Sequence, residues 1–315
     1  MSLNKEKNFV SAVVYMRNCR GSVASFLEAV TGQLEANFDR YEIICVNDKS
    51  TDATPKRIED FCRERRRQGR PVSCLTTLTT GFFQGVESAM TAGVDMAIGD
   101  FVFEFDSTAL DYPVELIMQV YRKSLEGHDI VFAVPAGSGR FMSKSFYRLF
   151  NSFSKMSYKI KTSRFSIISR RGINRVRSLG AKTVYRKAIY ASCGLPVVDI
   201  EYRPDGPAPD NAQKSLQWDL ALNSLILFTD IAYKISVTLS LLMALVLAGG
   251  AIYTVAVFLS ATPVAGWTTT MLVMSGGFFG LFLLFAITMK YLSLILNLIF
   301  SRREYIIERV DKIVK

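Results

Sequence analysis

The sequence is poor in the residues that build zinc sites and disulfide frameworks. It contains one histidine, His128, and five cysteines, none of them in C-x-x-C spacing. Structural zinc sites use several Cys or His ligands at short spacing, and an odd set of scattered cysteines is typical of reduced thiols in a cytosolic domain. These shortages argue against a zinc protein and against a disulfide-stapled secreted domain.

Acidic residues are missing from a long central stretch. Between Val131 and Val198 there are fourteen Lys or Arg and no Asp or Glu, and the whole chain carries a net charge of +10. Such an asymmetry indicates an anionic partner: nucleic acid, a phosphate-bearing substrate or an acidic lipid surface. The apolar segments that follow favour the last two, since a cation beside an anionic membrane gains about 1 kcal/mol. We expect no nucleic-acid partner.

Charge is absent from two long segments near the C-terminus. Residues 235–259 contain no charged side chain over 25 positions, and residues 261–289 contain none over 29. A helix needs about 20 apolar residues to cross the hydrocarbon core, and both segments come too late to be a signal peptide. A buried core helix is the alternative, and the length disfavours it. The sequence predicts two transmembrane helices, at about 235–259 and 265–289.

The flanking charges predict the orientation of these helices. The connector, residues 260–263, has no Lys or Arg, whereas Lys234, Lys290 and Arg302 lie at the other ends. By the positive-inside rule, both termini and the domain before the helices lie in the cytoplasm. We therefore expect a multi-pass protein of the inner (cytoplasmic) membrane.

The first two hundred residues alternate between strand-like and helix-like segments. Strand–helix alternation of this kind predicts an α/β domain with a mainly parallel sheet and helices on both faces. Ligands of such sheets bind at the carboxyl ends of the strands. The expected strands are residues 9–16, 41–46, 72–78, 101–105 and 129–134, and the expected helices are 22–36, 52–67, 86–97 and 113–124.

Polar residues gather at two of the expected strand ends. Asn47, Asp48 and Ser50 follow the second strand, where helix capping alone would explain only some of them. Glu104 and Asp106 end the fourth strand two positions apart, so that their side chains point to the same face. Acidic side chains at such an edge commonly hold a divalent cation through oxygen ligands.

The motifs, taken in order, resemble those of family 2 glycosyltransferases of the polyprenyl-phosphate group, which have the GT-A fold. V-N-D-K-S-T-D at residues 46–52 is similar to that group's V-D-D-G-S-T-D, and A-G-V-D-M-A-I-G-D at residues 92–100 to its A-G-L-D-x-A-x-G-D. D-S-T at residues 106–108 resembles its D-A-D, and D-Y-P at residues 111–113 its D-P-P. The resemblance covers nearly the whole chain.

The resemblance implies an inverting transfer of a sugar from a nucleotide-sugar donor to a polyprenyl phosphate, with Mg²⁺ or Mn²⁺ as cofactor and a homo-oligomeric enzyme. It implies nucleotide contacts at Asn18, Asn47, Asp48 and Ser50, and a metal at Asp106, with Glu104 or Asp111 as a further ligand. Asp106 is accordingly also expected to act in catalysis.

Two departures from the family pattern alter this expectation. Thr108 replaces the second acid of D-A-D, and Arg164 replaces the acid of D-F-R-L, which carries the family's presumed base. A phosphate monoester is already largely ionised at neutral pH, so a base is not indispensable. We expect Arg164 to act in catalysis by binding the acceptor phosphate, in a cationic group at the membrane. That group comprises Lys161, Arg164, Arg170 and Arg171.

The departures leave two other interpretations open. One is a catalytically weak or inactive homologue that binds nucleotide or lipid as the partner protein of a glycan-modification system. The other is a processive polysaccharide synthase, which the missing Q-x-x-R-W pattern disfavours. The expected organisation is a cytoplasmic GT-A domain (1–211), an amphipathic interfacial helix region (212–233), two transmembrane helices (234–290) and a cytoplasmic tail (291–315).

Overall fold

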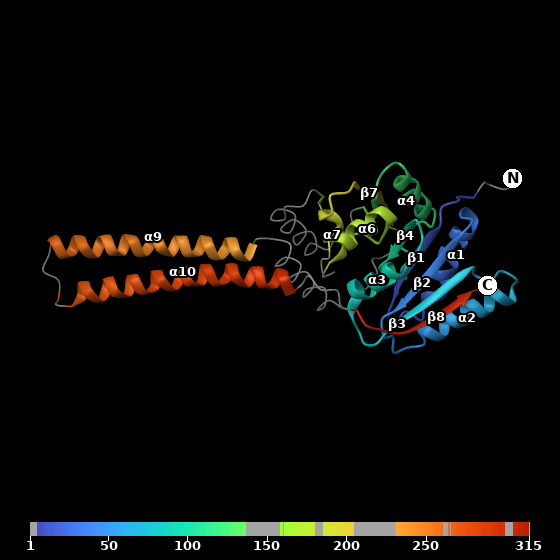
Figure 1. Cartoon of the computed structure of the whole chain (residues 1–315), viewed down its shortest axis with the longest axis horizontal. Coiled ribbons are helices and arrows are strands. Elements are labelled where there is room, and N and C mark those ends of the chain that lie inside the picture. The colour runs from blue at the N-terminus through green and yellow to red at the C-terminus, as the bar shows by residue number, and fades with distance from the viewer. Residues whose placement is uncertain are drawn as a thin grey trace. The chain divides into compact units, whose positions relative to one another are not determined.

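The structure, a computed structural model, divides the chain into two units, an α/β unit and a helical unit, and each is described by itself (Figure 1). The residues described are 5–136, 158–159, 161–179, 185–204, 231–260, 264, 266–299 and 305–314. Most of the expected interfacial helix region, 212–233, and part of the basic stretch lie outside them.

The α/β unit is built on an eight-stranded sheet of order β7-β5-β6-β4-β1-β2-β3-β8. The strands β1 to β4 run parallel, β5 and β7 pair in parallel, and β6 and β8 are antiparallel to their neighbours. The mainly parallel sheet is confirmed. Its strands are β1 (Val10–Met16), β2 (Tyr41–Asn47), β3 (Cys74–Thr80), β4 (Phe101–Phe105), β5 (Ile130–Pro135), β6 (Phe165–Ser169), β7 (Val197–Tyr202) and β8 (Ile307–Val314).

Helices cover both faces of the sheet, because the central strands are apolar on both sides. On one face α1 (Val23–Asn37), α2 (Thr54–Arg67) and α4 (Leu116–Leu125) pack on residues such as Val14 and Phe103. On the other face α3 (Gly85–Met96), α6 (Arg170–Ser178) and α7 (Arg186–Ser192) surround residues such as Val13 and Ile130. The two-faced packing agrees with the sequence prediction.

The last strand, β8, belongs to the α/β unit although it follows the helical unit in sequence. It pairs with β3 at the edge of the sheet (Figure 1). Gln84 fixes its start, donating to the carbonyl of Ile306 at 2.6 Å and accepting from the Ile306 amide at 3.1 Å. Residues 291–315 were expected to form a cytoplasmic tail; in the structure residues 291–299 belong to α10 (Trp267–Ile299), and residues 307–314 form β8.

The helical unit consists of α9 (Ile231–Ser260) and α10 (Trp267–Ile299), which run antiparallel side by side (Figure 1). The segments Val237–Ser260 and Trp267–Leu292 are long and apolar enough to cross a membrane, and 6% and 0% of their most apolar windows are buried. A core helix of a soluble protein would be mostly buried, so these exposed apolar surfaces suit a lipid environment.

The packing of α3 on the sheet depends on a glycine. A Cβ atom on Gly93 would lie 2.4 Å from Val13 Cγ1 and 2.6 Å from Val46 Cγ2. Both valines are fully buried strand residues that have no room to move aside. Gly93 therefore allows the close approach of helix and sheet.

We predict that Gly93→Ala destabilises the full-length protein by about 1–3 kcal/mol, because overpacking forces the backbone or its neighbours to shift. Thermal unfolding of the purified protein in detergent measures the effect. Gly32→Ala on α1 is the matched control, since nothing lies within 4 Å of its added Cβ; it should unfold at the wild-type temperature or slightly above. Equal stability of both variants would contradict the packing argument.

Candidate active site

The carboxyl ends of β1, β2, β3 and β4 meet at one edge of the sheet, because the four strands are parallel. The loops after β1 and β2 are joined there by side-chain hydrogen bonds. Asn18 Oδ1 accepts from the Thr51 amide at 2.8 Å, and Ser50 Oγ accepts from the Asn18 amide at 3.1 Å. Asn47 Oδ1 accepts from the Ser50 amide at 3.2 Å. The structure thus brings together three of the residues expected to contact the nucleotide.

Backbone conformation contributes to this junction. Asn18 and Lys49 have φ angles of 48° and 49°, in the left-handed region that Asn tolerates better than most residues. This gives a local reason for an asparagine at the second position after β1. Whether these residues contact a nucleotide stays a prediction.

Asp48 holds the start of α3 in place. Its Oδ1 accepts from Thr80 Oγ1 at 3.0 Å and the Gln84 amide at 2.9 Å, and its Oδ2 from the Tyr15 hydroxyl at 3.0 Å and the Gly85 amide at 2.9 Å. Burial and this carboxylate raise the pKa of Tyr15 above its ordinary value. A negative charge is favourable at a helix N-terminus. Asp48 is 0% exposed, so its geometry supports a positioning role, and its contact with a nucleotide stays a prediction.

The main charged group at this edge is a buried cluster around Arg186, the first residue of α7. The guanidinium donates to Asp106 Oδ1 at 2.5 Å, and its Nε lies 3.4 Å from Glu87 Oε2 and 3.9 Å from Glu104 Oε2. The Arg186 amide also donates to Glu87 at 2.8 Å. Since Glu104 and Asp106 both face Arg186, they share a face of β4, in agreement with the predicted alternation.

Two further side chains complete the cluster. Lys187 Nζ lies 3.0 Å from Asp106 Oδ2, and the Tyr190 hydroxyl donates to Glu104 Oε1 at 2.5 Å. Burial raises the pKa of Glu104, with Arg186 opposing it. Burial also works against the ionisation of Asp106, but Lys187 and Arg186 together hold its pKa below its ordinary value. Asp106 is thus an ionised acid with a cation on each carboxylate oxygen.

The residues expected to bind a metal have other partners in this arrangement. Glu104 accepts from Tyr190 and, at 3.5 Å, from Ser166, whereas Asp106 is paired with the two cations of α7. Thr108, in the position of the second family acid, shares a 2.7 Å hydrogen bond with Ser22. Among the described residues no group of three Cys, His, Asp or Glu side chains is arranged to hold a metal ion. The expected pairing of Glu104 with Asp106 as open metal ligands is therefore not formed.

Arg164 lies beside Asp106 at the same edge of the sheet. The antiparallel register pairs Phe105 with Phe165, so Asp106 and Arg164 occupy neighbouring positions just beyond this pair. Arg164 Nε donates to Asp111 at 2.6 Å, and both side chains are largely buried. Asp111 orients the Arg164 guanidinium, and the binding of an acceptor phosphate by Arg164 stays a prediction.

Arg170 and Arg171 lie at the opposite end of β6, so grouping them with Arg164 was wrong. Arg170 donates to the carbonyls of Ala97 and Gly99, which precede β4, and Arg171 binds Asp129, which precedes β5. The five-residue strand β6 separates the two ends by about 17 Å. Sequence proximity misled the prediction because this antiparallel strand was not foreseen.

Lys161, the fourth residue of the expected cationic group, lies near β7. Its Nζ is 3.1 Å from Asp199 and 3.1 Å from Glu201. Glu201 lies near the carboxyl end of β7, which is parallel to β5. Because β6 is antiparallel to β5, this end of β7 is at the same edge of the sheet as the start of β6, next to Arg164. Lys161 and Arg164 therefore lie at the same edge.

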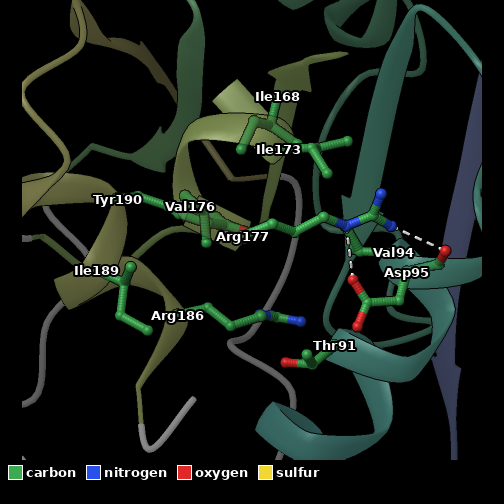
Figure 2. A pocket seen from close by; sticks show the side chains of 10 residues that line it. All are labelled: Thr91, Val94, Asp95, Ile168, Ile173, Val176, Arg177, Arg186, Ile189 and Tyr190. Atoms are coloured by element: carbon green, nitrogen blue, oxygen red, sulfur yellow. Dashed lines mark hydrogen bonds and ion pairs between the residues drawn. The ribbon is translucent and has the colours of Figure 1, made fainter. Parts of the chain in front are cut away.

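A small pocket opens on the face covered by α3, α6 and α7 (Figure 2). Arg177 and Arg186 extend into it side by side, and Arg177 pairs with Asp95 of α3 at 2.9 Å (Figure 2). The space for solvent inside is about 30 Å³. Sites for small-molecule ligands occupy roughly 300–1,000 Å³, so this pocket is too small for a nucleotide sugar.

The sequence interpretation missed Glu87, Arg186 and Lys187. Arg186 and Lys187 were counted only among the fourteen cations of the basic stretch, and Glu87 is the one acid in the first turn of α3. A signal did exist, since a buried acid such as Glu104 requires a partner. The sequence does not reveal which of many cations supplies it.

We predict that Arg186→Met destabilises the protein by about 3–5 kcal/mol, because it leaves three carboxylates in the cluster without their central cation. Thermal or denaturant unfolding in detergent measures the loss. Arg122→Met, at an exposed position of α4, should stay within about 0.5 kcal/mol of wild type. A stable Arg186→Met protein would mean that protons, rather than the guanidinium, neutralise these acids.

Comparison with known proteins identifies the family. Residues 11–190, more than half of the chain, match the glycosyl transferase family 2 model. An uncharacterized glycosyltransferase of Synechocystis is 31% identical over 62% of this chain, and the match spans 61% of that relative's length. A prophage bactoprenol glucosyl transferase homolog of Escherichia coli is 27% identical, with coverage of 75% of this chain and 77% of the relative.

A solved structure is similar to this chain over most of its length. The mannosyltransferase of Pyrobaculum calidifontis, solved in complex with GDP-Man and Mn²⁺, superposes with a TM-score of 0.50 over 93% of this chain and 88% of its own, at 14% identity. The sheet, its two helical layers and the family match lead to one conclusion: the chain belongs to glycosyl transferase family 2.

Proposed function

We propose that this glycosyltransferase moves a sugar from a nucleotide-sugar donor to a polyprenyl phosphate at the cytoplasmic face of a membrane. The observation that carries the proposal is the strand-end edge of the sheet, where ionised Asp106, Lys187 and Arg164 lie beside the joined loops of β1 and β2. The same chain continues into two apolar helices of membrane-spanning length. The bactoprenol glucosyl transferase homolog of Escherichia coli supports a polyprenyl acceptor.

The chemistry suits a single in-line displacement. An oxygen of the lipid phosphate attacks the anomeric carbon, the bond from that carbon to the donor diphosphate breaks, and the configuration inverts. The acceptor phosphate is largely dianionic at neutral pH, so no side chain has to remove a proton. Arg164, oriented by Asp111, binds and positions the acceptor phosphate, and this positioning supplies much of the rate enhancement. Cations at the edge neutralise the departing diphosphate.

A divalent cation was expected from the family resemblance, and the Pyrobaculum enzyme with Mn²⁺ supports divalent-cation use in this fold. The described residues do not fit a metal in the usual way, because Asp106 is held by Arg186 and Lys187 and the second acid is Thr108. The mechanism above therefore uses only side chains of this chain.

The position of β8 supports a hairpin that enters and leaves the membrane on one side. The α/β unit contains residues before α9 and residues after α10, namely the pair β3–β8. One folded unit lies on one side of a membrane, so the helices between its parts cross it an even number of times. The positive flanks then favour the cytoplasm for the α/β unit. A homo-oligomer remains an expectation.

The departures at Thr108 and Arg164 keep one alternative open: a homologue with little or no catalysis that binds nucleotide or lipid as a partner protein. The observation that favours it is that Arg164 is largely buried and already paired with Asp111. Activity distinguishes the two functions.

The transfer is tested with membranes from expressing cells, a panel of radiolabelled nucleotide sugars and extraction into chloroform. We expect chloroform-extractable label with at least one donor. The absence of label with every donor, with and without a divalent cation, would favour the partner protein.

Arg164→Ala should lower turnover at least tenfold and raise the KM for the lipid phosphate, because it removes a charge-assisted contact to the acceptor. The matched control is Arg171→Ala, at the other end of β6 and 68% exposed, which should keep wild-type kinetics. Unchanged acceptor KM and turnover in Arg164→Ala would refute its role.

The membrane orientation is tested by labelling with an impermeant maleimide in intact cells. Val264→Cys, between α9 and α10 and 83% exposed, should react from outside. Glu126→Cys, at the exposed residue that follows α4, should react only after the membrane is permeabilised. The reverse pattern would place the α/β unit outside the cytoplasm.

A further inference from the structure

We infer that Arg186 and Lys187 take the place of a divalent cation at Asp106, so that the donor diphosphate binds to side-chain cations and needs no added metal ion. The inference rests on the proposed function and specifies how its donor site works. It goes against the Mg²⁺ or Mn²⁺ expected from the family resemblance.

The first step of the argument is the occupation of Asp106. Each of its carboxylate oxygens already has a cationic partner: Arg186 at 2.5 Å on Oδ1 and Lys187 at 3.0 Å on Oδ2. A metal ligated by either oxygen would lie within a few ångströms of one of these positive groups, and like charges at that distance repel each other strongly. Metal binding would require the cations to leave.

The second step is that Arg186 cannot readily leave. Its side chain is 3% exposed and contacts acids from two different elements, Glu87 on α3 and Glu104 on β4. Moving it away would leave both acids buried without a counter-charge, which is costly. The guanidinium is therefore a fixed part of the site.

The third step is that the second metal ligand is missing. Thr108 offers a neutral hydroxyl, and this hydroxyl is already bonded to Ser22 at 2.7 Å. Glu104 is directed inward, onto Tyr190. Divalent cations at such sites prefer several oxygen ligands, charged ones above all. Asp106 alone, already paired with two cations, does not supply such a set of ligands.

The fourth step assigns the contact with the diphosphate. Of the two cations, Lys187 is the outer one: its side chain is 13% exposed, and that of its partner Asp106 is 22% exposed. The ion pair of Lys187 with Asp106 therefore reaches the surface at the strand-end edge, where ligands of parallel sheets bind. Two guanidinium atoms of Arg186, Nε and Nη1, are buried without a hydrogen-bond partner among the described residues. Arg186 thus stays buried among its acids, and the Lys187 ammonium is the positive group of this cluster that reaches the surface.

The test measures binding of nucleoside diphosphates (UDP, GDP, ADP, CDP and dTDP) to the full-length protein in detergent by calorimetry, once with EDTA and once with Mn²⁺. We expect at least one to bind with the same Kd, within about twofold, in both conditions. Lys187→Gln should weaken it roughly tenfold or more in both, because a charge-assisted contact is lost. The control Lys123→Gln, on α4 and paired with Glu126, should bind as wild type does.

A tenfold or greater loss of affinity in EDTA, restored by Mn²⁺, would overturn the inference while leaving the proposed function intact. Mn²⁺ titration followed by electron paramagnetic resonance gives an independent readout. Wild type should leave the spectrum of free Mn²⁺ unchanged, because Arg186 and Lys187 occupy both oxygens of Asp106. If no nucleotide binds in either condition, the proposed function fails. In that case the Mn²⁺ titration still tests the inference: stoichiometric Mn²⁺ binding by wild type that Asp106→Asn abolishes would overturn it.

Discussion

The site depends on one electrostatic constraint: three carboxylates from α3 and β4 are buried around a single guanidinium. A buried charge without a partner costs several kcal/mol, so Glu87, Glu104 and Asp106 are tolerable only with Arg186 among them. This constraint fixes α7 against the sheet and holds Lys187 at the strand-end edge. The ion pairs of Arg186 therefore determine the position of the Lys187 ammonium at the proposed substrate site.

A second constraint positions the loops around this cluster. Asp48 accepts four hydrogen bonds, two of them from the backbone amides at the start of α3, whose Glu87 then faces Arg186. The loop joined by Asn18 and Ser50 lies next to it. Positioning of this kind, in which each group is held by buried neighbours, prepares a site before its substrate arrives.

The sequence predicted the fold well, because its signals are local. Apolar runs such as residues 9–16 and 41–46 became β1 and β2, and two uncharged segments became α9 and α10. The elements that were missed are short or lie in strongly charged sequence; they are β6, α6, α7, β7 and β8. Their formation depends on partners distant in the chain, such as the pairing of β8 with β3.

The candidate site was only partly predictable for the same reason. The alternation of a strand placed Glu104 and Asp106 on one face, yet their partner Arg186 lies 80 residues from Asp106. Arg170 was grouped with Arg164 on sequence distance alone, whereas an antiparallel strand sends them to opposite ends of the sheet. Charge can be counted from a sequence, but the pairing of charges requires the fold.

An experimental structure of the full-length protein with a bound nucleoside diphosphate would test the central claim most directly. The account predicts the diphosphate at the carboxyl ends of β1 to β4, with a phosphate oxygen within hydrogen-bonding distance of Lys187 Nζ and no metal ion on Asp106. A nucleotide bound elsewhere, or a metal ion bridging Asp106 and the diphosphate with Lys187 displaced, would contradict it.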